Sequence, residues 1–141
     1  MKKVKFTVHS EPKGKERPRF NGNHAYTPKN TRNYEELVRY EYLHQCGTIR
    51  FKKALKVEIT AWYSIPNYLN KLDKSYMREN RKLPTKKPDC DNIAKAILDA
   101  LNDLAYDDDK QVTDLLITKR YTTTTPHIDV AIEEIECEAT E

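Results

Sequence analysis

The sequence predicts one domain of the α/β class, more narrowly α+β, in which a mixed sheet of about four strands is packed by two main helices. Two patterns support this prediction. Several segments alternate apolar and polar residues, as half-buried strands do, and two others repeat apolar residues at helical spacing. The 141 residues fit a single domain over 1–141, since domains usually hold about 100 to 200 residues.

The N-terminal half contains one strand, one basic loop and one helix. Residues 2–9 alternate and predict the first strand. Residues 11–30 hold several Pro and Gly among basic side chains, so no regular structure is expected there beyond a short hairpin. Apolar residues at helical spacing predict a helix over 32–46, with Asn33 and Glu36 as its capping pair.

The C-terminal half begins with a strand over 56–64, which alternates strictly. Residues 70–87 are rich in Lys and Arg and are interpreted as a basic connector. The apolar stripe over 91–104 predicts the second main helix. Two segments rich in β-branched and aromatic residues, 111–121 and 127–135, are expected to pair with each other as the closing strands.

Charge is distributed unevenly along the chain. The net charge is only +3, but no Lys or Arg follows Arg120. Residues 1–128 hold 25 basic and 16 acidic side chains, a balance of +9. This asymmetry favours a basic surface for a polyanion such as nucleic acid. A charged surface that is merely solvated is the alternative.

Cysteine usage and hydropathy exclude two classes of protein. Cys46, Cys90 and Cys137 are odd in number and lie far apart, without a C-x-x-C pair. We therefore expect a reduced, cytoplasmic protein without a structural zinc site. No apolar run approaches the roughly 18 residues that a membrane span needs, and no signal peptide is evident.

The segment Lys87–Asn92 carries the sharpest chemical pattern. Asp89 and Asp91 come just before, or within, the first turn of the second helix, where both carboxylates could face one cation. Lys95 lies four residues after Asp91 and shares its helix face. The alternative is an ordinary helix cap followed by an ordinary ion pair. Cys90 is expected to pack in the core and not to act as a nucleophile.

A second acidic cluster, Asp107–Asp109, follows the same helix. A helix that turns back onto a sheet can bring its two flanks together. Three successive aspartates repel one another unless they are solvated or bound to cations, and such hard oxygen ligands suit Mg²⁺ or Mn²⁺. An exposed acidic turn is the alternative.

Several separated motifs, in order, resemble those of the RusA-like Holliday junction resolvases. They are D-x-D-N-x-x-K at Asp89–Lys95, L-D-A-L-N at Leu98–Asn102, D-D-x-Q-V at Asp108–Val112 and the basic aromatic strand end Lys119–Tyr121. A looser likeness extends to the N-terminal loop at Lys13–Arg19.

The resemblance implies a homodimeric, Mg²⁺-dependent endodeoxyribonuclease that resolves four-way DNA junctions by paired nicks in recombination and repair. It makes Asp89, Asp91 and Asp109 catalytic metal ligands, with Asp108 beside them and Lys95 as the catalytic lysine. Asp107 lengthens the acidic run, so the main ligand within the run stays open. A nuclease of the same fold that acts on other branched DNA, and an inactive DNA-binding protein, are the alternatives.

Contacts with DNA can be predicted only by cluster. The candidates are Lys13, Lys15, Arg17, Arg19, Lys86, Lys87, Lys119 and Arg120. Contacts of this kind neutralise phosphates and supply affinity without reading bases, which suits an enzyme that recognises branched shape. Solvated surface is again the alternative for each residue.

Overall fold

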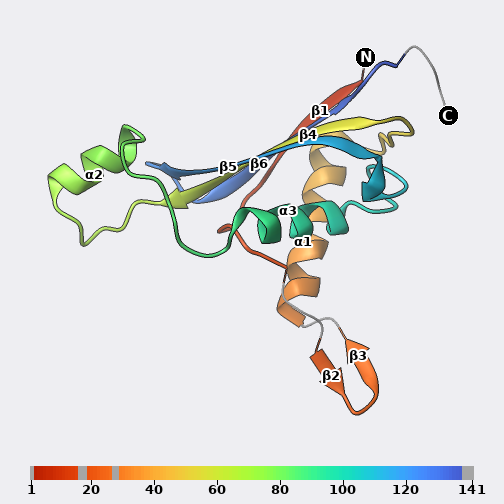
Figure 1. Cartoon of the computed structure of the whole chain (residues 1–141), viewed down its shortest axis with the longest axis horizontal. Coiled ribbons are helices and arrows are strands. Elements are labelled where there is room, and N and C mark those ends of the chain that lie inside the picture. Colours follow the sequence, from red (N-terminus) through yellow and green to blue (C-terminus); the bar gives the residue numbers. More distant parts are fainter. Residues whose placement is uncertain (1, 16–18, 27–28, 138–141) are drawn as a thin grey trace.

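The computed structural model describes residues 2–15, 19–26 and 29–137. In chain order its elements are β1 (Lys3–Val8), β2 (Arg19–Asn21), β3 (His24–Tyr26), α1 (Lys29–Cys46), β4 (Leu55–Ser64), α2 (Lys71–Arg78), α3 (Cys90–Ala100), the 3-10 helix η1 (Asp109–Gln111), β5 (Val112–Thr122) and β6 (His127–Glu134). Helices α1 and α3 cover one face of a four-stranded sheet, whereas α2 and the β2–β3 hairpin project from the body (Figure 1). The predicted single α+β fold with a mixed sheet is confirmed.

The order of strands differs from the prediction. The sheet runs β1-β6-β4-β5, with β4 parallel to β5 and antiparallel to β6, and with β6 also antiparallel to β1. The prediction that the last two strands pair with each other is therefore wrong. A parallel neighbour needs a crossover connection, which the chain supplies through α3. β5 therefore pairs with one edge of β4, and β6 takes the other edge.

Helix α1 begins earlier than predicted. It starts at Lys29, so Asn33 and Glu36 lie inside the helix and the predicted capping pair is wrong. The buried face explains the difference. Thr31 is buried together with Tyr34, which extends the inward stripe by one turn towards the N-terminus.

The basic connector predicted over 70–87 contains a helix, α2. Asn70 caps it, because its Oδ1 accepts a hydrogen bond from the Asp73 N–H at 2.8 Å, and Met77 is buried. Helix α3 ends at Ala100, before the predicted end at residue 104. Among the described residues, no helix combines the length and apolar character needed to cross a bilayer.

Side chains from outside α3 complete its C-terminal end. The Arg39 guanidinium of α1 donates to the carbonyl oxygens of Ala100 and Asn102 at 3.0 and 3.2 Å. The fully buried Tyr106 hydroxyl donates to the Leu98 carbonyl at 2.6 Å. These carbonyls lie where intrahelical donors run out, and the positive charge of Arg39 also favours the helix dipole.

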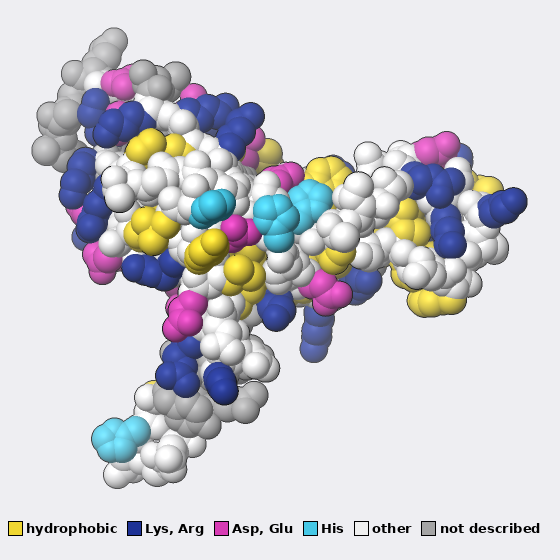
Figure 2. Space-filling model, turned by 180° about the vertical axis from the view of Figure 1, so that it is seen from behind, with side chains coloured by type: hydrophobic (Ala, Val, Ile, Leu, Met, Phe, Trp, Pro, Cys, Tyr) yellow, Lys and Arg dark blue, Asp and Glu magenta, His cyan; other side chains and the backbone are white. Residues whose placement is uncertain are grey.

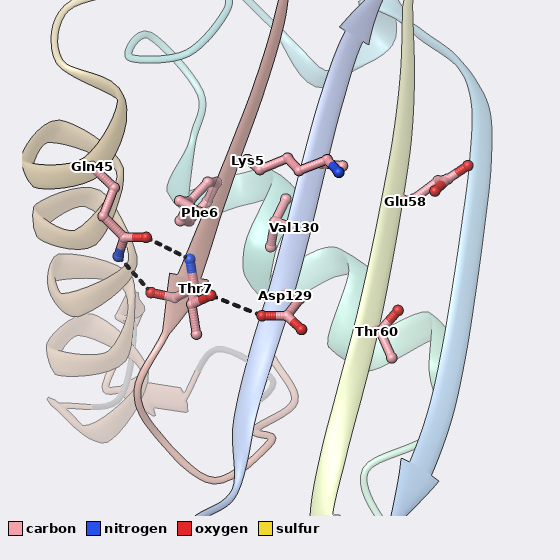
Figure 3. Close-up of a pocket in the computed structure, with 9 residues that line it drawn as sticks. Lys5, Phe6, Thr7, Gln45, Glu58, Thr60, Asp129 and Val130 are labelled. Carbon is pink, nitrogen blue, oxygen red and sulfur yellow. Dashed lines mark hydrogen bonds between the residues drawn. The ribbon is translucent and has the colours of Figure 1, made fainter. Parts of the chain in front are cut away.

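The two edges of the sheet differ in what covers them. At the β1 edge, Gln45 of α1 accepts a hydrogen bond from the Thr7 N–H at 2.8 Å and donates one to the Thr7 carbonyl at 2.7 Å (Figure 3). These bonds take the place of bonds to a further strand. At the opposite edge, Leu115 and Leu116 of β5 are exposed by 46% and 55%.

Replacing the buried hydroxyl at the end of α3 tests this packing. We expect Tyr106→Phe to lower the free energy of unfolding by about 1 to 2 kcal/mol, because the Leu98 carbonyl loses a donor in a site that water cannot reach. Denaturant titration measures the change. Tyr68→Phe is the control: Tyr68 is 87% exposed, so its change is expected to stay within about 0.5 kcal/mol. Equal stabilities for the two variants would contradict the role given to the Tyr106 hydroxyl.

Candidate active site

The first acidic pair lies where α3 begins. Asp89 is the N-cap, since its Oδ1 accepts a hydrogen bond from the Asn92 N–H at 3.1 Å. Asp91 lies in the first turn, and Lys95 follows one turn later; all three side chains are exposed. No ion pair joins Asp91 to Lys95 in the described chain. Cys90 is also exposed, so the prediction that it packs in the core is wrong: it starts the helix on the outward side.

Two amide side chains fold the acidic run Asp107–Asp109 into a tight turn. Asn102 Oδ1 accepts a hydrogen bond from the Asp109 N–H at 2.9 Å. Gln111 Oε1 accepts from the N–H groups of Asp107 and Asp108 at 2.9 and 3.1 Å, and its Nε2 donates to two backbone carbonyls of the segment before β4. The Asn and the Gln of the sequence motifs are therefore scaffolding residues for the acidic run, a role that their spacing alone did not predict.

The three acids of the run have different surroundings. Asp107 forms ion pairs with Arg50 and Lys52 at 2.6 and 2.9 Å. Hydrogen bonds from Lys52 and then Arg50 hold the pKa of Asp107 below its ordinary value. Asp108 caps η1 by accepting a hydrogen bond from a backbone N–H two residues ahead at 2.8 Å. Asp107 is thus occupied by cations of the chain, which leaves Asp108 and Asp109 as the candidate ligands.

A further carboxylate, Asp99 of α3, lies beside Asp109. The carboxylates of Asp99 and Asp108 are close enough to Asp109 to affect its ionisation. Burial raises the pKa of Asp109, and the two neighbouring negative charges raise it further. Lys15 offsets part of this charge: its ammonium lies 3.3 Å from the Asp99 carboxylate and also pairs with Glu35. Asp99 was present in the motifs but had no predicted role.

Helix α3 places acidic groups at both ends of one polar face. Asp91, Lys95 and Asp99 are spaced four residues apart, which puts them on the same side of the helix. The helical rise separates the α-carbons of Asp91 and Asp99 by about 12 Å. In residues 2–15, 19–26 and 29–137, no three His, Cys, Asp or Glu side chains converge closely enough to hold a metal ion. The two acidic clusters therefore do not share one protein-built cage.

The N-terminal basic loop packs directly on the start of α3. The Lys15 N–H donates to the Asn92 carbonyl at 3.2 Å. A β-carbon at Gly14 would lie 2.9 Å from the Asn92 β-carbon and 3.0 Å from that of Pro88, closer than side chains tolerate. Glycine permits this approach, and the approach carries Lys15 to Asp99.

The segment that leads into Asp89 is fastened to the sheet. The Tyr63 hydroxyl donates to the Pro88 carbonyl at 3.2 Å, and the Lys119 ammonium donates to the Lys86 carbonyl. The ammonium groups of Lys86 and Lys119 each lie 5.5 Å from the centre of the Tyr63 ring. Sequence alternation marks Tyr63 only as a core residue, so its contact with this segment was not predicted.

A family model described as endodeoxyribonuclease RusA matches residues 9–133 of the chain. The chain belongs to the RusA family. The family assignment makes the protein a resolvase-like endodeoxyribonuclease that binds branched DNA, of a type that generally uses divalent metal ions. A curated relative, the uncharacterized protein YqaN of Bacillus subtilis (strain 168), is 33% identical over 139 residues, which cover 94% of this chain and 96% of the relative.

In this RusA-family chain, four of the predicted DNA contacts lie in the segment before α3 and in β5. Lys86 and Lys87 are exposed before α3, whereas Lys119 and Arg120 of β5 are half-buried. Their contact with DNA stays a prediction.

The N-terminal loop supplies the other predicted contacts. Lys13 is exposed, with its ammonium 5.8 Å from the Tyr34 ring centre, and Lys15 is engaged by carboxylates of the chain. Arg17 lies outside the described residues, as does the side chain of Arg19.

The donor set fits a hard divalent ion such as the RusA family generally uses. Aspartate oxygens are the ligands that Mg²⁺ prefers, and Mg²⁺ commonly takes only one or two carboxylates, with water and substrate phosphates completing its shell. Burial first, and then the negative charges of Asp108 and Asp99, raise the pKa of Asp109, and a bound cation would offset these charges. Exposed Asp89 and Asp91 offer donors at the other end of α3.

Enlarging Gly14 tests the contact between the basic loop and α3. We expect Gly14→Ala to lower the free energy of unfolding by about 1 to 3 kcal/mol, because the added methyl group must displace Pro88 or Asn92. Gly22→Asn is the control, since Gly22 has open space around it and asparagine tolerates its positive φ of 65°. If Gly14→Ala unfolds at the same denaturant concentration as the wild type, the loop does not pack as described.

Removing the charge of Asp109 is expected to stabilise the protein. The folded state raises the pKa of Asp109, so ionisation costs stability at any pH above that pKa, and the cost disappears below the unfolded value near 3.8. In EDTA, Asp109→Asn should therefore gain on the order of 1 kcal/mol at neutral pH and nothing at acid pH. Thermal unfolding at the two pH values measures this difference. A gain in stability that is equal at the two pH values would show that it does not come from the charge of Asp109.

Proposed function

We propose that this protein is a Mg²⁺-dependent endodeoxyribonuclease that acts as a homodimer in the cytoplasm and resolves four-way DNA junctions by paired nicks, in recombination and repair. The family assignment supports nuclease action on branched DNA. The paired cleavage, the identity of the metal and the dimer are the parts that we add to it.

One observation carries the proposal: the outward face of α3 presents Asp91 and Lys95 to solvent, and neither forms an ion pair within the described chain. Asp91 and Lys95 are exposed and make no ion pair with each other, and Asp89 uses one oxygen to cap the helix. Exposed charges of this kind cost the fold little, because water solvates them. Held on a rigid, well-packed helix, they stay available to a charged substrate.

The residues have distinct roles in the proposed reaction. Asp89 and Asp91 at one end of α3, and Asp108 and Asp109 at the other, would each offer carboxylate oxygens to Mg²⁺, with water and DNA phosphates completing its shell; Mn²⁺ has the same donor preference. A bound divalent ion would polarise the scissile phosphate and make a neighbouring water more acidic. The Lys95 ammonium, midway along the polar face, offsets negative charge that develops on the phosphate oxygens during cleavage.

Two further parts of the proposal concern the substrate. A four-way junction has two-fold symmetry, so paired cuts at related phosphates call for two identical sites related by a two-fold axis. Exposed cations next to the site, Lys86 and Lys87 above all, would bind phosphates on either side of the cut. Binding through phosphates makes affinity fall steeply with salt.

Cleavage of a labelled synthetic four-way junction tests the proposed function. With Mg²⁺, the wild type should nick the junction at symmetrically related positions and leave linear duplex and single strands intact, and EDTA should stop the reaction. We expect Lys95→Met to reduce the rate constant at saturating enzyme by about 100- to 1,000-fold, as loss of one charge-stabilising donor does. Asp91→Asn should remove cleavage while junction binding persists.

Asp103→Asn is the matched control for these variants. Asp103 is a nearby acid whose side chain is 82% exposed, and asparagine tolerates its positive φ of 61°. The control should cut at the wild-type rate. Tight junction binding without metal-dependent cleavage would contradict the proposed nuclease activity and would indicate a structural DNA-binding protein. Nicks on other branched DNA in preference to four-way junctions would favour a nuclease of the same fold with a different substrate.

A further inference from the structure

A hollow lies between α2 and the turn that joins β5 to β6. Figure 1 shows α2 projecting at this end of the sheet. Its volume is about 310 Å³, and it is open to solvent. Hydroxyl, amide and basic side chains line it, among them Ser64, Asn67, Lys74, Arg78, Thr122 and Thr124. Among the described residues, no Asp or Glu lines the hollow, so it suits an anion and not a cation.

The positive charge comes from one face of α2. Lys74 and Arg78 lie four residues apart, which places them one turn apart on the same side of the helix. In the part of the chain that the structure describes, neither side chain forms an ion pair, although other cations of the segment do: Arg81 pairs with Glu79 at 3.9 Å. Two adjacent unpaired cations therefore face the hollow.

The opposite wall supplies neutral hydrogen-bonding groups. Thr122 Oγ1 accepts a hydrogen bond from the Thr124 N–H at 3.1 Å, and the two hydroxyls lie 2.9 Å apart. This arrangement fixes the turn and holds both hydroxyls at the rim. Threonine, serine and asparagine side chains, together with Lys and Arg, are the groups that bind phosphate oxygens in protein complexes with DNA.

The hollow is joined to the active site by a series of cations. The chain that leaves α2 carries Lys82, Lys86 and Lys87, all exposed, before it reaches Asp89 at the start of α3. Figure 2 shows Lys and Arg side chains gathered over the projecting α2 region. A polyanion that enters the active site would meet this series and then the hollow, which favours a DNA strand over a small phosphate compound.

We propose that the hollow between α2 and the β5–β6 turn is a second DNA contact, which binds a backbone phosphate of a junction arm through Lys74 and Arg78. This inference rests on the proposed function for its substrate, but it concerns binding and not cleavage. The α2 projection thereby lengthens the surface that holds an arm, away from the acids at which the strand is cut.

The salt dependence of junction binding tests the proposal. In Lys74→Gln/Arg78→Gln, binding of a four-way junction should weaken at low salt, and the slope of log affinity against log salt concentration should fall by about one for each subunit that loses its phosphate contact. The cleavage rate at saturating protein should stay at the wild-type value. Thr123→Glu, which adds a negative charge at the same hollow without removing either cation, should weaken binding in the same way.

Lys3→Gln/Lys56→Gln is the matched control. Both lysines are exposed, both pair with acids, and Lys56 lies near the opposite end of β4, about 26 Å from Ser64 by the rise of a strand. The control should keep the wild-type affinity and slope. An equal loss in the control and in the α2 variant would overturn the proposal, because it would reflect net charge alone.

Inorganic phosphate, used as a second probe, separates the two sources of this ligand chemistry. Loss of phosphate binding in the α2 variant, with junction affinity and salt slope unchanged, would overturn the DNA proposal and leave a site for small phosphate compounds. If the wild type binds junctions but never cuts them, the proposed catalysis fails, and the comparison of slopes still decides this inference. If the wild type binds no DNA, both proposals fail.

Discussion

The burial of α3 against the sheet is the constraint on which the rest of the site depends. Ile93, Ile97 and Leu101 are fully buried, so the rotation of this helix about its axis is fixed by the core. The polar face that carries Asp91 and Lys95 must then point outward. Every other part of the site is fastened to this helix or to its immediate flanks, by hydrogen bonds that would lose their partners if the helix rotated.

These hydrogen bonds involve the N-terminal loop, β4 and the segment that follows α3. The N-terminal loop bonds to the Asn92 carbonyl, Tyr63 of β4 bonds to the Pro88 carbonyl, and Asn102 holds the backbone of Asp109. Each of these hydrogen bonds holds a backbone group of the site and not an acidic side chain. The scaffold therefore positions the acids through their backbone, while Asp89 and Asp108 each use only one carboxylate oxygen, as a helix cap.

The sequence predicted those features that depend on local periodicity. The alternation in β4 and the apolar stripe of α3 follow from which side of an element is buried, so both could be recognised without a structure. The strand order could not be predicted, because β-branched and aromatic content identifies β5 and β6 as strands but does not say which strand lies beside each of them. The many cations of α2 concealed a helix whose inward contact depends mainly on Met77.

The motif residues illustrate a second limit. Sequence reasoning placed Asp89 at a helix start, and the structure confirms that it caps α3. It could not separate Asp107 from its neighbours, because the cations that occupy Asp107 come from Arg50 and Lys52, far away in the sequence. Nor could it find that Lys15 meets Asp99, since that pair exists only through the close approach at Gly14.

The unlike edges of the sheet limit how copies of this chain can associate through their strands. Gln45 occupies the outward backbone groups of Thr7, so the β1 edge is closed at that residue, while β5 presents two exposed leucines. Two β5 edges can pair about a two-fold axis, and the joined sheet then ends in β1 on both sides. Further strand addition at β1 would meet the Gln45 side chain at Thr7, whereas a sheet with two bare edges would be free to polymerise into a fibre.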